Sequence, residues 1–318
     1  MKIYLLLIII FFNSLFAIPL RQELSTKDNS YIYYIDFPNN FEKFPIILAI
    51  EGSYNDRIGP QSVLRLHKNL APEILKNNIG LMLLEKRGID GNDVNINIFH
   101  QFNTTSQRLL DHIHFIKEFK KNPPNNWNGD LIILGGSEGG PIAIKLAHKI
   151  TPNTCIAIVG CGDLSVKEYI WKEIQKIYAS SSIWEKPIIK WIYQLPSTRT
   201  KYDILCDKIK NNPDTQKKWF GQTFLYWSDC FDQSEDQEFL SLKCPSLIIS
   251  GEQDIECFST KRLIKKAKEN KQNVTHICIK KMGHNALNPK WGVLKNVLKW
   301  CNQILKPTKK YSITKNLE

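Results

Sequence analysis

Short apolar runs alternate with amphipathic segments along most of this chain. The apolar runs predict strands at Tyr31–Phe37, Phe44–Ile50, Gly80–Glu85, Asp130–Leu134, Cys155–Val159, Ser246–Ser250 and Val274–Ile279. The amphipathic segments predict helices at Pro60–Lys76, Thr105–Lys121, Pro141–Ile150, Ser259–Glu269 and Trp291–Leu305. Because most of these strands are apolar throughout, the pattern predicts an α/β fold with a mostly parallel, eight-stranded type of sheet and helices on both of its faces.

This alternation stops between Leu164 and Leu242, where helical patterns are rich in aromatic residues. We expect residues 164–242 to form a helical lid inserted into the core, which divides the core into residues 18–163 and 243–306. Most of the aromatic side chains are expected to pack inside the lid, because large aromatic residues are usually buried. A few of them, such as Trp219, Tyr226 or Trp227, are candidates to line an acyl pocket.

The first residues have the pattern of an export signal. One basic residue, Lys2, precedes an unbroken apolar run over Tyr4–Phe12, which is too short to span a bilayer. We expect a signal peptide over residues 1–17, cleaved after Ala17, and a secreted or periplasmic protein. An uncleaved anchor is the alternative. At the other end, residues 307–318 form a polar, basic tail.

A glycine-rich turn follows the strand predicted at Asp130–Leu134. In Gly135-Gly136-Ser137-Glu138-Gly139-Gly140, a serine lies between a strand and a helix, with glycines two positions before and after it. This is the context of a nucleophile elbow, where a sharp turn exposes the serine hydroxyl and leaves no room for neighbouring side chains. A phosphate loop or a dinucleotide loop would need other residues around these glycines. Ser137 is therefore the candidate nucleophile.

A serine nucleophile needs a base and an acid, which follow it along the chain in this kind of fold. His284 follows the strand predicted at Val274–Ile279 and is the candidate base, because most other histidines fall within predicted helices or strands. Asp254, just after the strand predicted at Ser246–Ser250, is the candidate acid that orients the imidazole. Asp163, at the end of an earlier strand, is the reserve.

Two backbone amides must stabilise the oxyanion that forms on the substrate carbonyl. Glu138 supplies one by its position directly after Ser137. The second amide is expected in the loop after the strand at Phe44–Ile50, where Ser53 is the first candidate and Gly52 the second.

The elbow, the acid turn Ser250-Gly251-Glu252-Gln253-Asp254 and the base turn Gly283-His284 together resemble the α/β-hydrolase superfamily over residues 31–305. The resemblance implies a serine hydrolase with a triad of Ser137, His284 and Asp254. One departure concerns the oxyanion loop, where Glu51-Gly52 replaces the His-Gly pair usual in the superfamily. Glu138 also differs from the aromatic residue that often follows the serine in proline-specific and oligopeptide-cleaving relatives, and it favours an ester hydrolase.

Composition and charge narrow the range of partners. The 318 residues carry a net charge of +12 that is spread over the chain, and no helix interleaves arginine with aromatic residues, so nucleic acid is not an expected partner. No cofactor or metal is expected, since no cysteine or histidine cluster has zinc spacing. In an oxidising compartment disulfides are allowed, and Cys206 with Cys230 is the best candidate pair.

Three functions remain open. The first is an exported enzyme that cleaves a carboxylic ester or thioester of a small molecule through an acyl-Ser137 intermediate. The second is an exported aminopeptidase or oligopeptidase of the same fold, in which a peptide amine would be bound by carboxylates among Glu51, Glu138, Glu235, Asp236 and Glu238. The third is a catalytically silent binding protein. Membrane contact would come only from an uncleaved signal or the basic surface.

Overall fold

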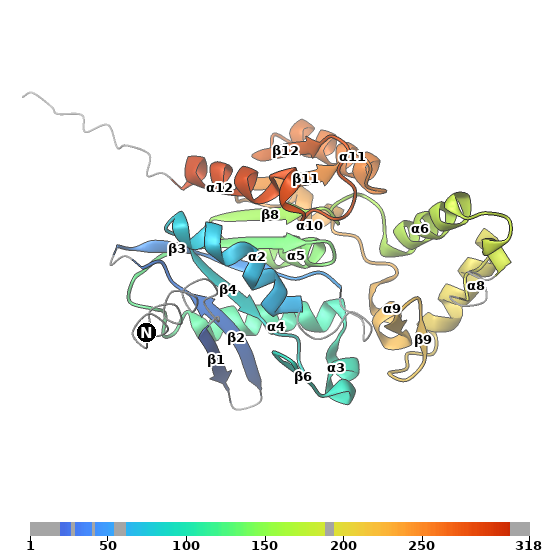
Figure 1. Ribbon diagram of the computed structural model, residues 1–318, viewed down its shortest axis with the longest axis horizontal. Helices are drawn as coiled ribbons and strands as arrows, with labels where there is room; N and C mark the ends of the chain where they lie inside the picture. Colours follow the sequence, from blue (N-terminus) through green and yellow to red (C-terminus); the bar gives the residue numbers. More distant parts are fainter. Residues whose placement is uncertain (1–19, 27–28, 40–41, 54–61, 188–193, 306–318) are drawn as a thin grey trace, which may run out of the picture.

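The computed structural model describes residues 20–26, 29–39, 42–53, 62–187 and 194–305. Among these residues, eight strands form one sheet in the order β1-β2-β4-β3-β7-β8-β11-β12 (Figure 1). The pairs from β4 to β12 are parallel, whereas β1 with β2 and β2 with β4 are antiparallel. The predicted fold class is thereby confirmed. The predicted signal peptide and the polar tail lie outside the described residues.

The strands follow the apolar runs closely. Their bounds are β1 (Leu20–Ser25), β2 (Ser30–Asp36), β3 (Phe44–Ile50), β4 (Gly80–Leu84), β7 (Trp127–Gly136), β8 (Thr154–Ile158), β11 (Ser246–Gly251) and β12 (Val274–Ile279). The sequence pattern missed β1, whose side chains are exposed or half-buried and carry no apolar signal. It also missed three short elements, β5 (Ile89–Asp90), β6 (Asp93–Val94) and α3 (Ile96–Phe102).

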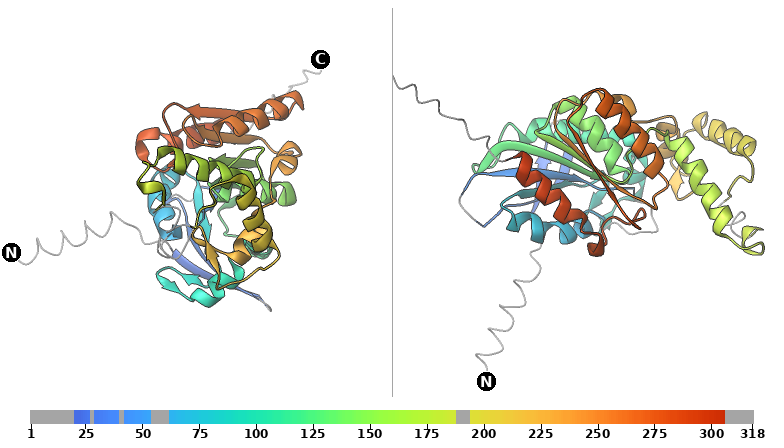
Figure 2. Two further views of the ribbon diagram at one scale, coloured as in Figure 1. Left: turned by 90° about the vertical axis from the view of Figure 1, so that its right-hand side faces the viewer. Right: turned by 90° about the horizontal axis from the view of Figure 1, so that it is seen from above.

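Helices cover both faces of the sheet (Figure 2). On one face lie α2 (Ser62–Lys76) and α12 (Val293–Ile304), which share an apolar cluster with central strand residues such as Ile47 and Ile132. On the other face lie α4 (Thr105–Phe119), α5 (Gly139–Ile150) and α11 (Cys257–Glu269). This double covering explains why the central strands are apolar on both sides.

The buried face of α4 contains polar residues beside the apolar ones. Ile116 and Phe119 are buried, and Leu109 and Ile113 pack half-buried against the core. Leu110 is 47% exposed, whereas Arg108, Asp111 and His112 are buried beside Phe115. The polar residues are tolerated there because they have partners: Arg108 donates to the carbonyl of residue 51 at 2.7 Å, and Asp111 accepts from Arg87 at 2.5 Å. A pattern that scores only apolar positions cannot find such a face.

Between β8 and β11 the chain leaves the sheet and forms a separate group of helices. These are α6 (Val166–Ser180), α8 (Arg199–Lys210), α9 (Phe224–Cys230) and α10 (Asp236–Leu240), with a small hairpin of β9 (Lys218–Trp219) and β10 (Gln222–Thr223). Most of this group projects beyond one end of the sheet (Figure 1). Its aromatic residues form an apolar cluster of their own, which includes Trp219, Tyr226 and Trp227.

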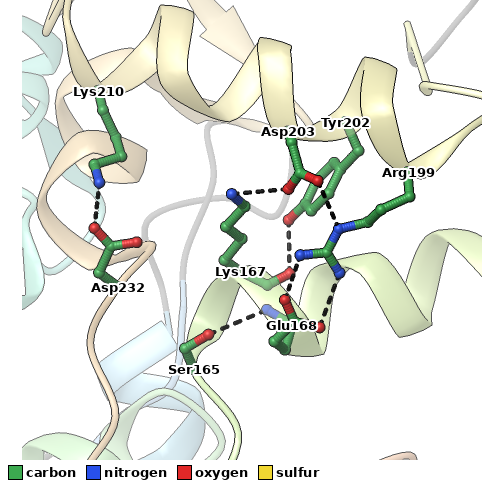
Figure 3. A network of polar contacts seen from close by, with 8 residues as sticks. All are labelled: Ser165, Lys167, Glu168, Arg199, Tyr202, Asp203, Lys210 and Asp232. Atoms are coloured by element: carbon green, nitrogen blue, oxygen red, sulfur yellow. Dashed lines mark hydrogen bonds and ion pairs between the residues drawn. The ribbon is translucent and has the colours of Figure 1, made fainter.

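A polar network joins α6 to α8 within this group (Figure 3). Arg199 donates to both carboxylate oxygens of Glu168, at 2.9 and 2.5 Å, and to Asp203 at 2.9 Å. Lys167 pairs with Asp203 at 2.8 Å, and the Tyr202 hydroxyl donates to the Lys167 carbonyl at 2.7 Å. Because Arg199 and Glu168 are well exposed, their ion pair orients the helices more than it stabilises them, and such pairs contribute about 0–1 kcal/mol.

The predicted disulfide between Cys206 and Cys230 is wrong, since all eight cysteines are free thiols in the structure. Both residues are buried in the apolar cluster of the α6–α9 helices and pack there as small apolar side chains. Burial raises the pKa of the Cys206 thiol to about 11. The thiol therefore stays protonated at neutral pH, which disfavours oxidation.

No helix among the described residues is long and apolar enough to cross a membrane. Nor do three or more of their histidine, cysteine, aspartate or glutamate side chains gather in a group that could hold a metal ion.

Candidate active site

Ser137 lies in a tight turn between β7 and α5. Its backbone has a φ of +54°, which is rare for a residue with a side chain, and its amide donates to the Ile158 carbonyl at 3.0 Å. Two glycines make this turn possible: a Cβ at Gly135 would lie 1.9 Å from the Gly139 carbonyl oxygen, and one at Gly139 would lie 2.2 Å from the Ile50 carbonyl oxygen. The strained conformation is thus imposed by backbones that pack without intervening side chains.

The glycines of the turn are not equivalent. A Cβ at Gly136 would meet nothing closer than 3.7 Å, so the expectation that this glycine also supplies room is wrong. A glycine that sequence reasoning missed does so instead. Gly160, in the loop after β8, has a φ of +67° and would place a Cβ 2.2 Å from the Ser137 carbonyl oxygen.

The structure brings Ser137, His284 and Asp254 into one hydrogen-bonded row. His284 lies in the loop after β12, and its Nε2 is 2.8 Å from the Ser137 Oγ. Its Nδ1 is 2.9 Å from the Oδ2 of Asp254, which lies in the loop after β11. Because a carboxylate accepts the proton of Nδ1, the lone pair of Nε2 faces the serine hydroxyl, as a general base requires.

The hydrogen bond between His284 and Asp254 shifts the pKa of both residues. The hydrogen bond with Asp254 raises the pKa of His284, against burial that lowers it. Burial acts to raise the pKa of Asp254, but hydrogen bonds from His284 and from the Glu256 amide outweigh it, and the pKa of Asp254 is lowered. Asp254 is 8% exposed and its side chain is still better hidden. The arrangement therefore keeps the carboxylate charged beside the imidazole.

The reserve acid and the other histidines have different partners. Asp163 accepts from Arg262 at 2.9 and 2.5 Å, so its carboxylate orients that guanidinium and is not the acid of the row. His67 is 2.5 Å from Asp36, and His112 is 2.7 Å from the Arg108 carbonyl. These contacts are structural, as the sequence pattern predicts for histidines within helices.

The loop after β3 lies directly beside the nucleophile. A Cβ on Gly52 would be 3.1 Å from the Ser137 Cβ and 3.6 Å from its Oγ, so the backbone of this loop approaches the hydroxyl closely. Ser53 follows it and lines the same cavity as Ser137 and His284. Glu138 directly follows Ser137 and is the N-cap residue of α5. All three residues that sequence reasoning proposes for the oxyanion site are thus adjacent to Ser137.

Buried ionic residues hold the two sides of this oxyanion site together. Arg108 on α4 donates to the Glu51 carbonyl oxygen at 2.7 Å, and its guanidinium also lies 2.9 Å from a carboxylate oxygen of Glu138. Lys86 donates to the Gly52 carbonyl oxygen at 3.0 Å and lies 3.4 Å from the Glu51 carboxylate. One arginine therefore bridges the loop after β3 and the residue after the nucleophile. We call these four residues, Glu51, Lys86, Arg108 and Glu138, the oxyanion clamp.

Sequence reasoning missed Arg108 and Lys86. The only signal in the sequence is the pair of unusual glutamates, Glu51 and Glu138, which need buried cations if they are to remain charged. Nothing in the sequence identifies which cations those are, because Arg108 is 57 residues from Glu51 along the chain.

A cavity of about 1430 Å³ opens at the row. Its lining includes Gly52, Ser53, Ser137 and His284, and then residues of α2 and α12. The described lining contains no residue of the helices between β8 and β11. Trp219, Tyr226 and Trp227, the candidates for an acyl pocket, are at most 5% exposed and contact one another through their rings. The Tyr226 hydroxyl also lies against the Glu138 carboxylate.

Comparisons with known proteins agree with this architecture. A model of the family described as serine aminopeptidase, S33, matches residues 61–290. Among curated proteins, none matches the chain in sequence. Proteins of solved structure are similar in fold at low sequence identity.

Three of these structures illustrate the range of activities. Est1E from Butyrivibrio proteoclasticus is 15% identical, with a TM-score of 0.57, over 89% of this chain and 98% of that one. Proline iminopeptidase from Mycobacterium smegmatis is 11% identical, with a TM-score of 0.60, over 90% and 98%. The esterase Pf2001 from Pyrococcus furiosus is 14% identical, with a TM-score of 0.55, over 91% and 89%. At these identities the likeness concerns the fold.

Proposed function

The chain belongs to the serine aminopeptidase S33 family of α/β-hydrolases, and from this premise we propose that it is an exported serine hydrolase that cleaves a carboxylic ester or thioester through an acyl-Ser137 intermediate. The observation that carries the proposal is the row of Ser137, His284 and Asp254, with 2.8 Å from Oγ to Nε2 and 2.9 Å from Nδ1 to Oδ2. These are the distances that proton transfer from the nucleophile requires.

The mechanism follows from the geometry. His284 takes the proton of Ser137 as the Oγ attacks the substrate carbonyl, and Asp254 stabilises the imidazolium that results. The imidazolium then gives this proton to the departing alcohol or thiol, which leaves an ester between the acyl group and Ser137. Water attacks that ester, with His284 again as base, and releases the acid and free Ser137.

The oxyanion of each step would be held by backbone amides of Glu138 and of Ser53 or Gly52. Such donors contribute about 2.7–4 kcal/mol each to the transition state when they are held in place beforehand. The oxyanion clamp supports this role, because Arg108 contacts both the Glu51 carbonyl and the Glu138 carboxylate. The superfamily usually has a histidine at the position of Glu51. Here Glu51 pairs with Lys86, which also donates to the Gly52 carbonyl, and together they hold this loop in place.

The clamp also bears on the choice between ester and peptide. Glu51 already pairs with Lys86 and Glu138 with Arg108, so neither carboxylate is available to bind a peptide amine. Glu235 accepts from the Gly162 amide at 3.1 Å, and burial raises its pKa to about 7. Three of the carboxylates considered for an amine site are thus engaged within the protein, which favours an ester or thioester substrate.

An aminopeptidase is the second candidate function. Besides the family, one observation favours it: the carboxylates of Glu256 and Glu173 lie near enough to His284 to contribute to its raised pKa. Of the two, Glu173 is the carboxylate that would bind the amine of a short peptide, because burial raises the pKa of Glu256 to about 8 and leaves it largely protonated at neutral pH.

The two functions are separated by comparing the hydrolysis of short aryl esters with that of aminoacyl anilides by the purified protein. We expect kcat/KM for the ester to exceed that for the anilide, and both to fall in Ser137→Ala by about 10⁴-fold or more, as in other triads. A higher kcat/KM for the anilide would favour the aminopeptidase. Ester hydrolysis that survives Ser137→Ala would exclude both.

A further inference from the structure

The cavity at Ser137 continues away from the row as a groove between two helices. On the side of α2 the groove is lined by Arg65, Leu66, Asn69, Leu70 and Glu73 of the helix, and by Asn77 directly after it. Its α12 lining includes Leu294, Lys295, Leu298, Lys299 and Asn302. Within each set, residues recur at intervals of three or four, so a single stripe of each helix faces the groove. The groove thus runs along the two helix axes rather than across them.

The bottom of the groove is apolar. Ile50, Leu134 and Ile158, at or near the carboxyl ends of β3, β7 and β8, line it next to Ser137. Leu70 and Leu298 continue this surface along α2 and α12, and each is 5% exposed. The polar and charged side chains of the two stripes form the rim, since Asn69, Glu73, Lys295 and Lys299 are exposed. An apolar floor under a polar rim suits an unbranched hydrocarbon chain.

The length of the groove can be estimated from α2. From Arg65 to Lys76, the last residue of α2, the helix advances about 17 Å. At the far end the Asn302 side-chain amide donates to the Asn77 side-chain oxygen at 3.4 Å, which connects α12 to α2 and closes the groove. An extended chain advances about 1.2 Å per bond, a third of the reach of one extended residue, so this length holds roughly 14 carbons.

We propose that this groove between α2 and α12 binds the acyl chain of the substrate, so that the protein acts on esters or thioesters of long, unbranched fatty acids. The inference rests on the proposed function, because the position of Ser137 at one end of the groove identifies the occupant. A carbonyl carbon at the Ser137 Oγ directs its chain along the floor of the groove. The aromatic cluster of the α6–α9 helices does not supply this pocket, since its side chains pack against one another.

The first test is the dependence of turnover on acyl length, measured with aryl esters from acetyl to hexadecanoyl below their critical micelle concentrations. We expect kcat/KM to rise by about 10-fold or more between the butanoyl and dodecanoyl esters, since each buried methylene can add up to about 4-fold. A profile that is flat or falls beyond the butanoyl ester overturns the proposal, while turnover of the acetyl ester that depends on Ser137 leaves the proposed function intact.

The second test blocks the groove. Asn69→Trp and Leu294→Trp each place a large side chain in the lining of the groove, whereas Lys76→Trp alters an exposed residue of α2 outside it. We expect the first two variants to lose about 10-fold or more of kcat/KM for the dodecanoyl ester and to keep that for the acetyl ester within about 2-fold, since only the long chain reaches the block. Lys76→Trp should keep both. An equal loss for both esters overturns the proposal.

The third test does not depend on catalysis. Binding of dodecanoate to Ser137→Ala is measured by calorimetry, with and without Asn69→Trp. We expect saturable binding that weakens by about 10-fold or more when the groove is blocked, as expected for several methylenes left unburied. Binding that the block does not change, or no binding at all, overturns the acyl groove even if the protein hydrolyses short esters. If the block weakens binding but the wild-type protein shows no esterase activity, the groove is retained and the proposed function is rejected.

Discussion

At the scale of single residues, two glycines of the elbow that look alike in the sequence differ in the space available for a side chain. An added Cβ at Gly139 meets the Ile50 carbonyl oxygen at 2.2 Å, whereas one at Gly136 has 3.7 Å of room. We expect Gly139→Ala to destabilise the fold by about 1–3 kcal/mol, as overpacking does, and to displace Ser137. Gly136→Ala is the matched control and should change neither property much. Urea unfolding and ester turnover of both variants check this.

The pH dependence of activity is the second prediction at this scale. His284 must be neutral to act as a base, and its hydrogen bond with Asp254 raises its pKa. The acidic limb of kcat/KM should therefore have its midpoint above the ordinary histidine value of about 6.5, and activity should be lost as pH falls through that midpoint.

Asp254→Asn should shift this limb to lower pH, because the carboxylate that favours the imidazolium is gone. It should also lower kcat by about 10⁴-fold, since the amide no longer holds the correct tautomer. A pH profile of the residual activity checks the shift. A limb that stays in place in Asp254→Asn would show that Asp254 does not set the pKa of His284.

Much of the candidate site follows from the sequence, because a turn leaves a local signature. The glycines around Ser137, and the loops that follow two late apolar strands, place Ser137, Asp254 and His284 in the right order. Arg108 leaves no such signature. Its role depends on a contact between α4 and a loop 57 residues away, and neither element indicates the other through its own pattern.

At the scale of elements, the oxyanion clamp connects α4, β3 and the elbow. Arg108→Met removes the partner of the Glu138 carboxylate and of the Glu51 carbonyl, and breaking a buried ion pair in this way costs about 3–5 kcal/mol. The double variant Arg108→Met with Glu138→Met should recover part of that stability, since it leaves no unpaired charge at residue 138. Urea unfolding of the two single variants and the double variant measures the coupling.

The same substitutions separate stability from catalysis. In the double variant the fold is largely restored but the two sides of the oxyanion site are no longer connected, so kcat should remain low by up to about 10²-fold, as expected for a small misplacement of catalytic groups. KM for a short ester should change less than kcat. A double variant with wild-type kcat would show that the clamp serves stability alone.

The sequence predicts well those strands whose two faces are both buried, and it predicts edge strands and partly polar helix faces less well. The strands at Phe44–Ile50 and Val274–Ile279 begin and end where their apolar runs predict. The edge strand β1 was missed, because pairing with β2 needs no apolar side chain. On α4 the apolar positions indicate only part of the buried face, because Arg108, Asp111 and His112 are buried with polar partners that the sequence does not reveal.

At the scale of the whole molecule, buried carboxylates make stability depend on pH. Burial raises the pKa of Glu256 to about 8, helped by the neighbouring Glu235 and Asp254, and burial raises that of Glu235 to about 7. In the unfolded chain both lose their protons at ordinary values near 4.5. Above that pH the folded protein holds more protons than the unfolded chain, so stability falls as pH rises towards 7 or 8.

The expected slope is up to about 1.4 kcal/mol per pH unit for each of these carboxyl groups. Glu256→Gln should flatten it, because an amide occupies the same space without titrating. Glu269→Gln, at the exposed end of α11, is the control and should leave the slope unchanged. The free energy of unfolding in urea at about pH 5 and about pH 7.5 measures the effect. Stability that rises over this range in the wild type and in Glu256→Gln alike would contradict the account.

The central claim is that Ser137 is a nucleophile activated by His284, and covalent labelling tests it most directly. The folded protein is incubated with a fluorophosphonate, digested, and examined by mass spectrometry, beside Ser137→Ala, His284→Ala and an unrelated serine hydrolase. We predict one adduct, on the peptide that contains Ser137, absent from Ser137→Ala and formed much more slowly in His284→Ala. No adduct on Ser137 while the unrelated hydrolase is fully labelled would contradict the claim.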